Sequence, residues 1–258
     1  EAEPLYQQAL EMWKKVLGTE HPLVAASLNN LAGLYEDQGR YTEAEPLYQQ
    51  ALEMWKKVLG AEHPSVAASL HNLAGLYYYQ GRYTEAELLS QKALEMIKKL
   101  LGAEHPYVAQ SLENLAVLYS AQGRYTEAEP LFIEALEMRK KLLGAEHPLV
   151  AASLSNLAFL YSDQGRYIEA EPLYTKSLET RKKLLGAEHP LVATSLNNLA
   201  GLYSAQGNIA LALQYLERGL EVQEKNLTYN LAAGAEPQKD KYLKTISGAK
   251  ARAISLHL

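Results

Sequence analysis

Apolar residues recur along the chain at three- and four-residue spacing, the period of an amphipathic α-helix. In one such stretch Leu70 and Tyr77 belong to the apolar side, and polar residues fall between. Pro64 suits the first position of this helix and Gly81 its end. The pattern therefore predicts a helix over about residues 64–80.

A second apolar pattern follows directly and predicts a helix that starts near Thr42 and its equivalents. In one copy Thr84 and Glu87 match a capping box, and Gly102 ends the helix. Prolines of this pattern are expected in the first turn, where a lost backbone donor costs little; they are Pro4, Pro46, Pro130 and Pro172. We expect antiparallel helices joined by short turns, nine or ten in all, and no strands.

The helix pair repeats every 42 residues, as His-Pro at 21, 63, 105, 147 and 189 shows. The segment EAEPLYQQALEMWKKVLG occurs unchanged at 1–18 and 43–60, so recent duplication weakens recurrence as a sign of function. We interpret residues 1–18 as the second helix of a truncated repeat. Residues 19–225 make five units, the last degenerate, and residues 226–258 capping and linker helices that lead to an absent downstream domain.

The pattern breaks after Gly207, where we expect one long helix that stops near Gly234 and a further helix from Pro237. The chain then ends in an apolar stretch without a stop signal, which favours an excerpt from a longer protein.

Within one unit the recurring residues are Leu28, Leu31, Ala32, Tyr35, Gly39, Tyr41, Ala44, Tyr48 and Ala51. Their pattern resembles that of the tetratricopeptide repeat (TPR) family. This resemblance implies an all-α, right-handed superhelical solenoid of antiparallel helix pairs, whose first helices line a concave groove. The 42-residue unit with its LG-x-EHP loop most resembles the kinesin light chain type.

Residues 230–258 are similar to the stretch that follows the repeats in bacterial, often cyanobacterial, proteins with a caspase-like CHAT domain. That family's catalytic His and Cys would lie beyond Leu258. Proteolysis is therefore a hypothesis about a parent protein.

Composition excludes several classes of function. A net charge of −5 without a basic patch disfavours nucleic acid and anionic membranes. The absence of cysteine removes disulfides, thiolate metal sites and a cysteine nucleophile. With no long apolar run and no signal peptide, we expect a soluble, cytoplasmic protein without cofactors.

One asparagine recurs in the first helix of every unit. On a helical wheel Asn72 points roughly 150° from the apolar side. The TPR resemblance then implies a row along the groove, made of Asn30, Asn72, Asn114, Asn156 and Asn198. A side-chain amide both donates and accepts, so such a row could bind the backbone of an extended peptide. Alternatively, duplication copied a solvated asparagine, or the amide bonds a neighbouring helix.

Residues beside this row vary and would select among ligands: Asn29, Glu36, Asp37, His71, Tyr78, Tyr79, Glu113, Phe159, Asp163 and Asn197. Tyr78, Tyr79 and Phe159 are candidate anchors, with ordinary packing as the alternative. The acidic members favour a neutral or basic peptide over an acidic one. At His71 a polar contact is favoured over catalysis, because no partner acid or nucleophile is placed beside it.

Two further rows have structural interpretations. Histidines of the repeated loops lie about 20 Å apart by helix-packing distances, too far to share a metal ion, so we interpret them as loop residues. Arg40, Arg82, Arg124 and Arg166 are interpreted as a solvated face.

The sequence thus favours a non-catalytic scaffold that binds a protein or extended peptide and recruits it to an effector domain outside the chain. The first alternative is a regulatory array that restrains a downstream CHAT protease domain. An enzyme is disfavoured, since no nucleophile, base and orienting acid can be placed together. The apolar face that carries Trp13 could also let truncated fragments stack end to end.

Overall fold

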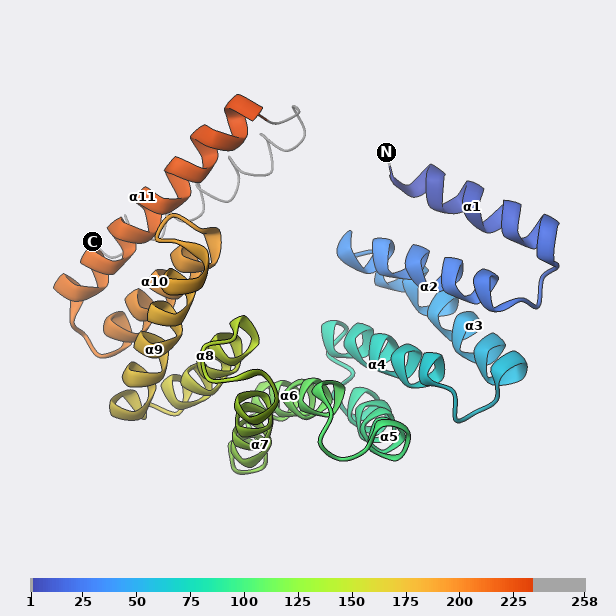
Figure 1. Ribbon diagram of the computed structural model, residues 1–258, viewed down its shortest axis with the longest axis horizontal. Helices are drawn as coiled ribbons and strands as arrows, with labels where there is room; N and C mark the ends of the chain where they lie inside the picture. The colour runs from blue at the N-terminus through green and yellow to red at the C-terminus, as the bar shows by residue number, and fades with distance from the viewer. Residues whose placement is uncertain (1, 234–258) are drawn as a thin grey trace. The chain divides into compact units, whose positions relative to one another are not determined.

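The computed structural model describes residues 2–233, which form eleven α-helices and no strand (Figure 1). First helices of the repeats are α2 (Pro22–Asp37), α4 (Pro64–Tyr79), α6 (Pro106–Ala121), α8 (Pro148–Asp163) and α10 (Pro190–Ala205). Second helices are α1 (Ala2–Leu17), α3 (Tyr41–Leu59), α5 (Tyr83–Leu101), α7 (Tyr125–Leu143), α9 (Tyr167–Leu185) and α11 (Ile209–Ala233). The all-α prediction is confirmed.

The described residues form eleven helices, more than the predicted nine or ten. The long helix expected after Gly207 is α11, which ends at Ala233, next to the expected stop at Gly234. The further helix expected from Pro237, and most of the stretch similar to CHAT proteins, lie outside the described residues. No helix within residues 2–233 is both long enough and apolar enough to cross a membrane.

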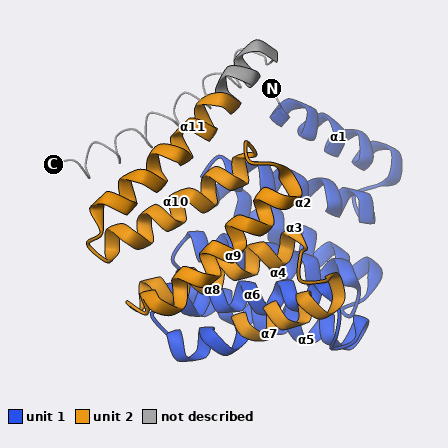
Figure 2. Ribbon diagram, turned by 60° about the vertical axis from the view of Figure 1, so that its left-hand side comes forward, with its two compact units in different colours: residues 1–131 blue, residues 132–258 orange. Residues whose placement is uncertain are grey.

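The chain divides into two compact units, residues 1–131 and residues 132–258 (Figure 2). In the first unit α2 packs against α1 and α3, and α4 against α3 and α5. In the second unit α8 packs on α9, and α10 lies between α9 and α11. Leucine, valine, alanine and tyrosine of the repeated pattern fill these contacts; Leu70 and Leu76, for example, are buried.

Each loop histidine caps the first helix that follows it. His63 has extended backbone, and its Nδ1 accepts a hydrogen bond from the backbone N–H of Ser65 at 3.1 Å. Pro64 stands between them at the first helical position, where it has no N–H to satisfy. The same arrangement recurs at His21, His105, His147 and His189. These histidines are therefore N-caps of the first helices, which explains why the repeated loop has a histidine at this position.

Starts of the second helices differ from the prediction. The residue before α5 is Arg82, which makes no side-chain capping bond, so the capping box of Thr84 and Glu87 is wrong. Glu87 instead accepts hydrogen bonds from Tyr119 and Arg124 of the next repeat. The prolines also lie deeper than expected, at the sixth helical position, where they remove a hydrogen bond to the carbonyl four residues before; they are Pro46, Pro130 and Pro172.

The arginine row is a structural clamp, and its interpretation as a solvated face is wrong. The Arg82 guanidinium lies over the Tyr77 ring, 3.9 Å from its centroid. It donates to Glu45 on the preceding second helix at 2.8 Å and to Glu85 in its own helix at 2.9 Å. Arg40 and Arg124 repeat these contacts. Each clamp ties two second helices to the end of a first helix.

Candidate functional site

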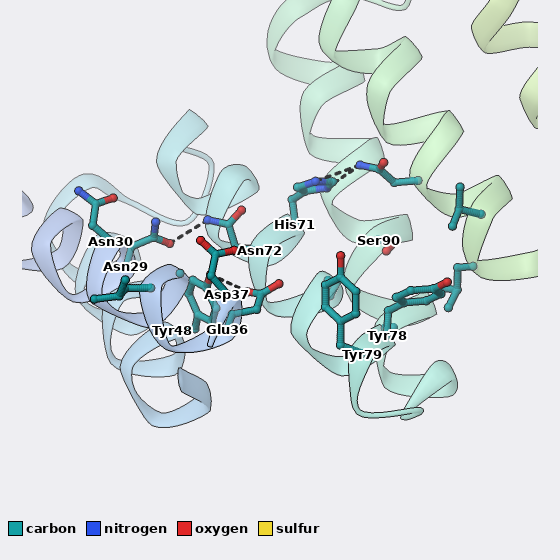
Figure 3. A pocket seen from close by; sticks show the side chains of 18 of the residues that line it. Asn29, Asn30, Glu36, Asp37, Tyr48, His71, Asn72, Tyr78, Tyr79 and Ser90 are labelled. Atoms are coloured by element: carbon teal, nitrogen blue, oxygen red, sulfur yellow. Dashed lines mark hydrogen bonds between the residues drawn. The ribbon is translucent and has the colours of Figure 1, made fainter. Parts of the chain in front are cut away.

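The first unit carries a cleft of about 600 Å³ between α2, α4 and α6 (Figure 3). Side chains of α3 and α5 also line it, notably Tyr48 and Ser90. The cleft brings together six of the predicted groove residues of this unit and three of its asparagines: Asn29, Asn30, Glu36, Asp37, His71, Asn72, Tyr78, Tyr79 and Asn114.

Small residues at three positions explain why the cleft is open. Ser90 stands where the last repeat has Leu216 and the four other repeats have an aromatic residue, namely Tyr6, Tyr48, Phe132 and Tyr174. Gly33 and Gly75 of the first helices line the same space without a side chain. Two of the aromatic residues, Tyr6 and Tyr48, thus form walls of the cleft, whereas the corresponding Ser90 leaves room.

One wall of the cleft is acidic. Tyr48 donates its hydroxyl hydrogen to Glu36 Oε2 at 2.8 Å, which orients that carboxyl group (Figure 3). Burial raises the pKa of Glu36 above its usual value, and the hydrogen bond from Tyr48 opposes this shift only in part. Asp37, the next residue, is exposed at the rim. Among the described residues, no cation forms a hydrogen bond to either of these adjacent carboxyl groups, so a positive ligand group would be stabilised here.

The opposite wall is aromatic. Tyr79 is 59% exposed and stacks on Tyr41, with ring centroids 6.1 Å apart and planes 6° from parallel. Tyr78 meets Tyr79 edge to face at 5.5 Å and also contacts Tyr83. Packing and exposure therefore coexist here: neighbouring rings hold Tyr79 in place while more than half of its surface stays available. A fixed, exposed ring suits both apolar groups and cations.

The repeated asparagines make hydrogen bonds between repeats. Asn72 Nδ2 donates to Asn29 Oδ1 at 2.9 Å, and Asn114 Nδ2 donates to His71 Nε2 at 2.9 Å (Figure 3). Burial lowers the pKa of His71, which favours the neutral ring that can accept this bond. The alternative that these amides bond a neighbouring helix holds for Asn72 and Asn114. In both pairs the invariant residue contacts the variable residue of the preceding repeat.

Fewer amide atoms of the asparagine row are therefore available to a ligand than the sequence indicated. Asn114 Oδ1 also accepts from Gln110 at 3.0 Å, so both ends of this amide have partners within the protein. Asn30 is exposed. Asn72 is half-buried, and its bond to Asn29 uses the amide nitrogen rather than the amide oxygen. Within the first unit, Asn30 and Asn72 are the members best placed to contact a ligand.

Several predicted residues lie elsewhere. Glu113 is only 5% exposed and does not line the cleft, so its assignment to the groove surface is corrected. In the second unit Phe159 is 60% exposed, Asp163 is exposed, and Asn156 and Asn198 are half-buried.

Asn197 packs into its own repeat. Its Oδ1 is buried, has no hydrogen-bond partner among the described residues, and lies where a Cβ at Gly219 would collide with it. Its assignment as a specificity residue is corrected in part, because the amide oxygen faces α11. Glycine at position 219 provides the space that this arrangement needs.

Sequence reasoning missed Tyr48 and Ser90 as residues of the site. Tyr48 matched the family pattern and is 3% exposed, so it looked like a core residue only. The available signal was the exception at Ser90, the one small polar residue in an otherwise aromatic or aliphatic column of the repeat. A gap in a repeated core position predicts a cavity.

The family model for the tetratricopeptide repeat matches residues 1–39, 23–99, 72–141, 107–182 and 149–225. A search of curated proteins found no match. The crystal structure of BtubC (BKLC) from P. vanneervenii is similar, with 24% identity and a TM-score of 0.73; the match covers 86% of this chain and 90% of that one.

A crystal structure of nearly identical TPR-like repeats from a putative kinesin light chain of Podosopora anserina matches at 34% identity and a TM-score of 0.66. That match covers 80% of this chain and 98% of the other. The apo form of RapI matches at 20% identity and a TM-score of 0.66, over 97% of this chain and 90% of that one. The chain is an array of tandem repeats that belongs to the tetratricopeptide repeat family.

Proposed function

We propose that this array is a non-catalytic scaffold that binds an extended, basic peptide in the cleft between α2, α4 and α6. The observation that carries the proposal is the placement of Glu36 and Asp37 in the same cleft as the exposed ring of Tyr79. A lysine or arginine side chain would gain from both, because carboxylates attract its charge and the ring can stack on it.

Asparagine amides that line the cleft would hold the peptide backbone. Asn72 Oδ1 can accept a peptide N–H, while its Nδ2 is bound to Asn29. Asn30, which is exposed, can both donate and accept. Such contacts do not depend on the ligand's side chains, so selectivity would come from the acidic and aromatic walls. TPR arrays are typically protein-interaction scaffolds, which agrees with this role.

The experiment compares wild type with the double variant Glu36→Gln and Asp37→Asn in binding to an array of lysine- and arginine-containing peptides. Glutamine can still accept the hydrogen bond from Tyr48, so the fold should be kept. We expect affinity for basic peptides to fall roughly tenfold and its salt dependence to weaken.

A matched control removes the same charge outside the cleft, by Glu11→Gln and Glu53→Gln, two exposed residues of α1 and α3. This variant should bind as wild type does. Equal binding by wild type and the cleft variant would refute recognition of a cationic side chain by Glu36 and Asp37.

A further inference from the structure

A second cavity of about 510 Å³ adjoins the cleft in the first unit. It lies between the first half of α4, the end of α5 and the start of α6, and its walls are largely apolar, with Ile97 and Leu101 among them. His71 and Asn72 line both the cavity and the cleft. A peptide bound in the cleft can therefore place a side chain in the cavity.

One position of the repeat explains the cavity. The equivalents of Ile97, at steps of 42 residues, are Trp13, Trp55, Arg139, Arg181 and Gln223. Trp55 is 8% exposed and Arg139 2% exposed, so these long side chains occupy the interior beside the next first helix. Isoleucine is the shortest residue in this column, and the cavity lies where the longer side chains would extend.

In the second unit, arginine side chains occupy the position equivalent to Ile97, and their hydrogen bonds show which groups this position can bind. Arg181 Nη1 donates to Ser195 Oγ at 2.7 Å and to the Leu191 carbonyl oxygen at 3.3 Å. Arg139 makes the equivalent bond to Ser153 Oγ at 2.6 Å. A guanidinium group is thus held by a serine hydroxyl and a carbonyl in the first turns of a first helix.

The same acceptors are present at the cavity without an arginine. Ser111 Oγ donates to the Tyr107 carbonyl oxygen at 3.0 Å, just as Ser195 Oγ donates to the Leu191 carbonyl at 3.1 Å beside Arg181. Because the hydroxyl hydrogen is used in this bond, the Ser111 lone pairs are left as acceptors. Ser111 and Tyr107 both line the cavity.

We infer that the cavity binds an arginine side chain of the peptide held in the cleft, with the guanidinium donating to Ser111 Oγ and the Tyr107 carbonyl. The aliphatic stem of the arginine would pack on Ile97 and Leu101. This inference rests on the proposed function and adds a second anchor to it. Arginine suits the site better than lysine because its planar fork can reach two acceptors at once.

The positions of the two sites along α4 set the spacing of the anchors. Residues 64–72 contribute to the cavity and residues 71–79 to the cleft, so their centres are about seven residues, or about 10 Å, apart along the helix. An extended chain advances about 3.3 Å per residue. Because Glu36 and Asp37 lie on α2, across the cleft from α4, this offset is a lower limit, and the ligand should carry an arginine at least about three residues from the basic residue that enters the cleft.

Variants at Ile97 test the inference by filling the cavity from within. Ile97→Arg copies the next two repeats and Ile97→Trp the two preceding copies, so both variants should fold. Peptides with a constant basic residue for the cleft carry Arg, Lys, Trp or Ala at the second anchor. On wild type the Arg peptide should bind roughly tenfold tighter than the Ala peptide. Both Ile97 variants should abolish this preference and leave the affinity of the Ala peptide unchanged.

Three results would overturn the arginine site: equal binding of the Arg and Ala peptides to wild type, an Arg preference that survives Ile97→Arg, or a preference for the Trp peptide, which would indicate an aromatic pocket.

A small probe that binds only in the cavity tests the arginine site separately from peptide binding in the cleft. N-acetylarginine amide should shift the methyl NMR signals of Ile97 in wild type, and Ser111→Ala should weaken the shift. If this probe binds but no peptide does, the cavity chemistry stands and the proposed function fails. The cavity inference alone fails if the cleft variants weaken peptide binding, the probe does not bind, and the Arg peptide binds no more tightly than the Ala peptide.

Discussion

The two units are built from the same repeat, yet they use its variable positions in opposite ways. In the first unit the side chains of Asn29 and His71 accept hydrogen bonds from the asparagine of the next repeat. In the second, Ser155 turns to Ser177 Oγ at 2.8 Å, and Asn197 packs toward Gly219. The first unit therefore has polar pairs at the edge of an open cleft, and the second directs the same positions into its own helix pair.

The contrast extends to the positions that decide whether space is open. Ser90 and Ile97 of the first unit stand where other repeats have larger residues, and both line cavities. Arg139 and Arg181 close the position of Ile97 in the second unit. Open space in this array thus follows from a few shorter side chains, while the helical frame stays constant.

Ser90→Tyr should have the largest effect on this contrast. It restores the aromatic residue found at Tyr6, Tyr48 and Tyr174, so it should fold while filling the cleft. Affinity for basic peptides, measured by calorimetry, should fall roughly hundredfold, about 2.7 kcal/mol. Ser90→Ala is the control and should bind as wild type does. Undiminished binding by Ser90→Tyr would place the ligand elsewhere.

Gly219→Ala should destabilise the second unit. A Cβ there collides with Asn197 Oδ1, and overpacking of this kind costs about 1–3 kcal/mol, offset in part by the better helix propensity of alanine. Urea unfolding should show a net loss of up to about 2 kcal/mol. Adding Asn197→Ala removes the colliding atom and should restore stability. A loss that persists in the double variant would mean that the glycine acts through another contact.

His71 should make the first unit less stable in mild acid. Because burial lowers its folded-state pKa, the unfolded chain binds more protons between that pKa and the ordinary histidine value near 6.5. The free energy of unfolding should therefore fall as the pH decreases through this window. His71→Gln should lose this part of the pH dependence, whereas His21→Gln, at the half-buried cap of α2, should retain it. Parallel curves for wild type and His71→Gln would contradict the burial effect.

Glu36 should act in the opposite direction, because burial raises its pKa and the hydrogen bond from Tyr48 opposes this shift only in part. Its raised pKa means that the folded state binds more protons than the unfolded chain just above the ordinary value of 4.5. Its contribution to stability therefore declines as the pH rises through this window. Glu36→Gln keeps the acceptor for Tyr48 and should equal or exceed wild type in thermal stability at neutral pH. A lower melting temperature for this variant would show that the charge itself stabilises the fold.

The helical frame was largely readable from the sequence because local chemistry marks it. Pro64 begins α4 and Gly102 follows the end of α5, as their backbone preferences predict. Asn72 was placed away from the apolar side, but its partner Asn29 lies 43 residues earlier. The clamp partner Glu45 is likewise 37 residues from Arg82. Such contacts depend on how successive repeats stack, which helix periodicity alone does not specify.

The cavities were harder to predict because they arise from missing volume. Ser90 and Ile97 are unremarkable residues in isolation, and their meaning appears only when each column of the repeat is aligned with the packing of the helices. Recent duplication also makes most columns of the repeat nearly constant, so the invariant asparagines are a stronger pattern in the sequence than the two exceptions, Ser90 and Ile97.

The most direct test of the account is the affinity of wild type for a peptide with one lysine for the cleft, compared with the same peptide acetylated at that lysine. Acetylation removes the charge and retains most of the shape. We predict a roughly tenfold loss of affinity for wild type and no difference for the Glu36→Gln, Asp37→Asn variant. Equal affinity of wild type for both peptides would contradict the claim that the cleft selects a cationic side chain.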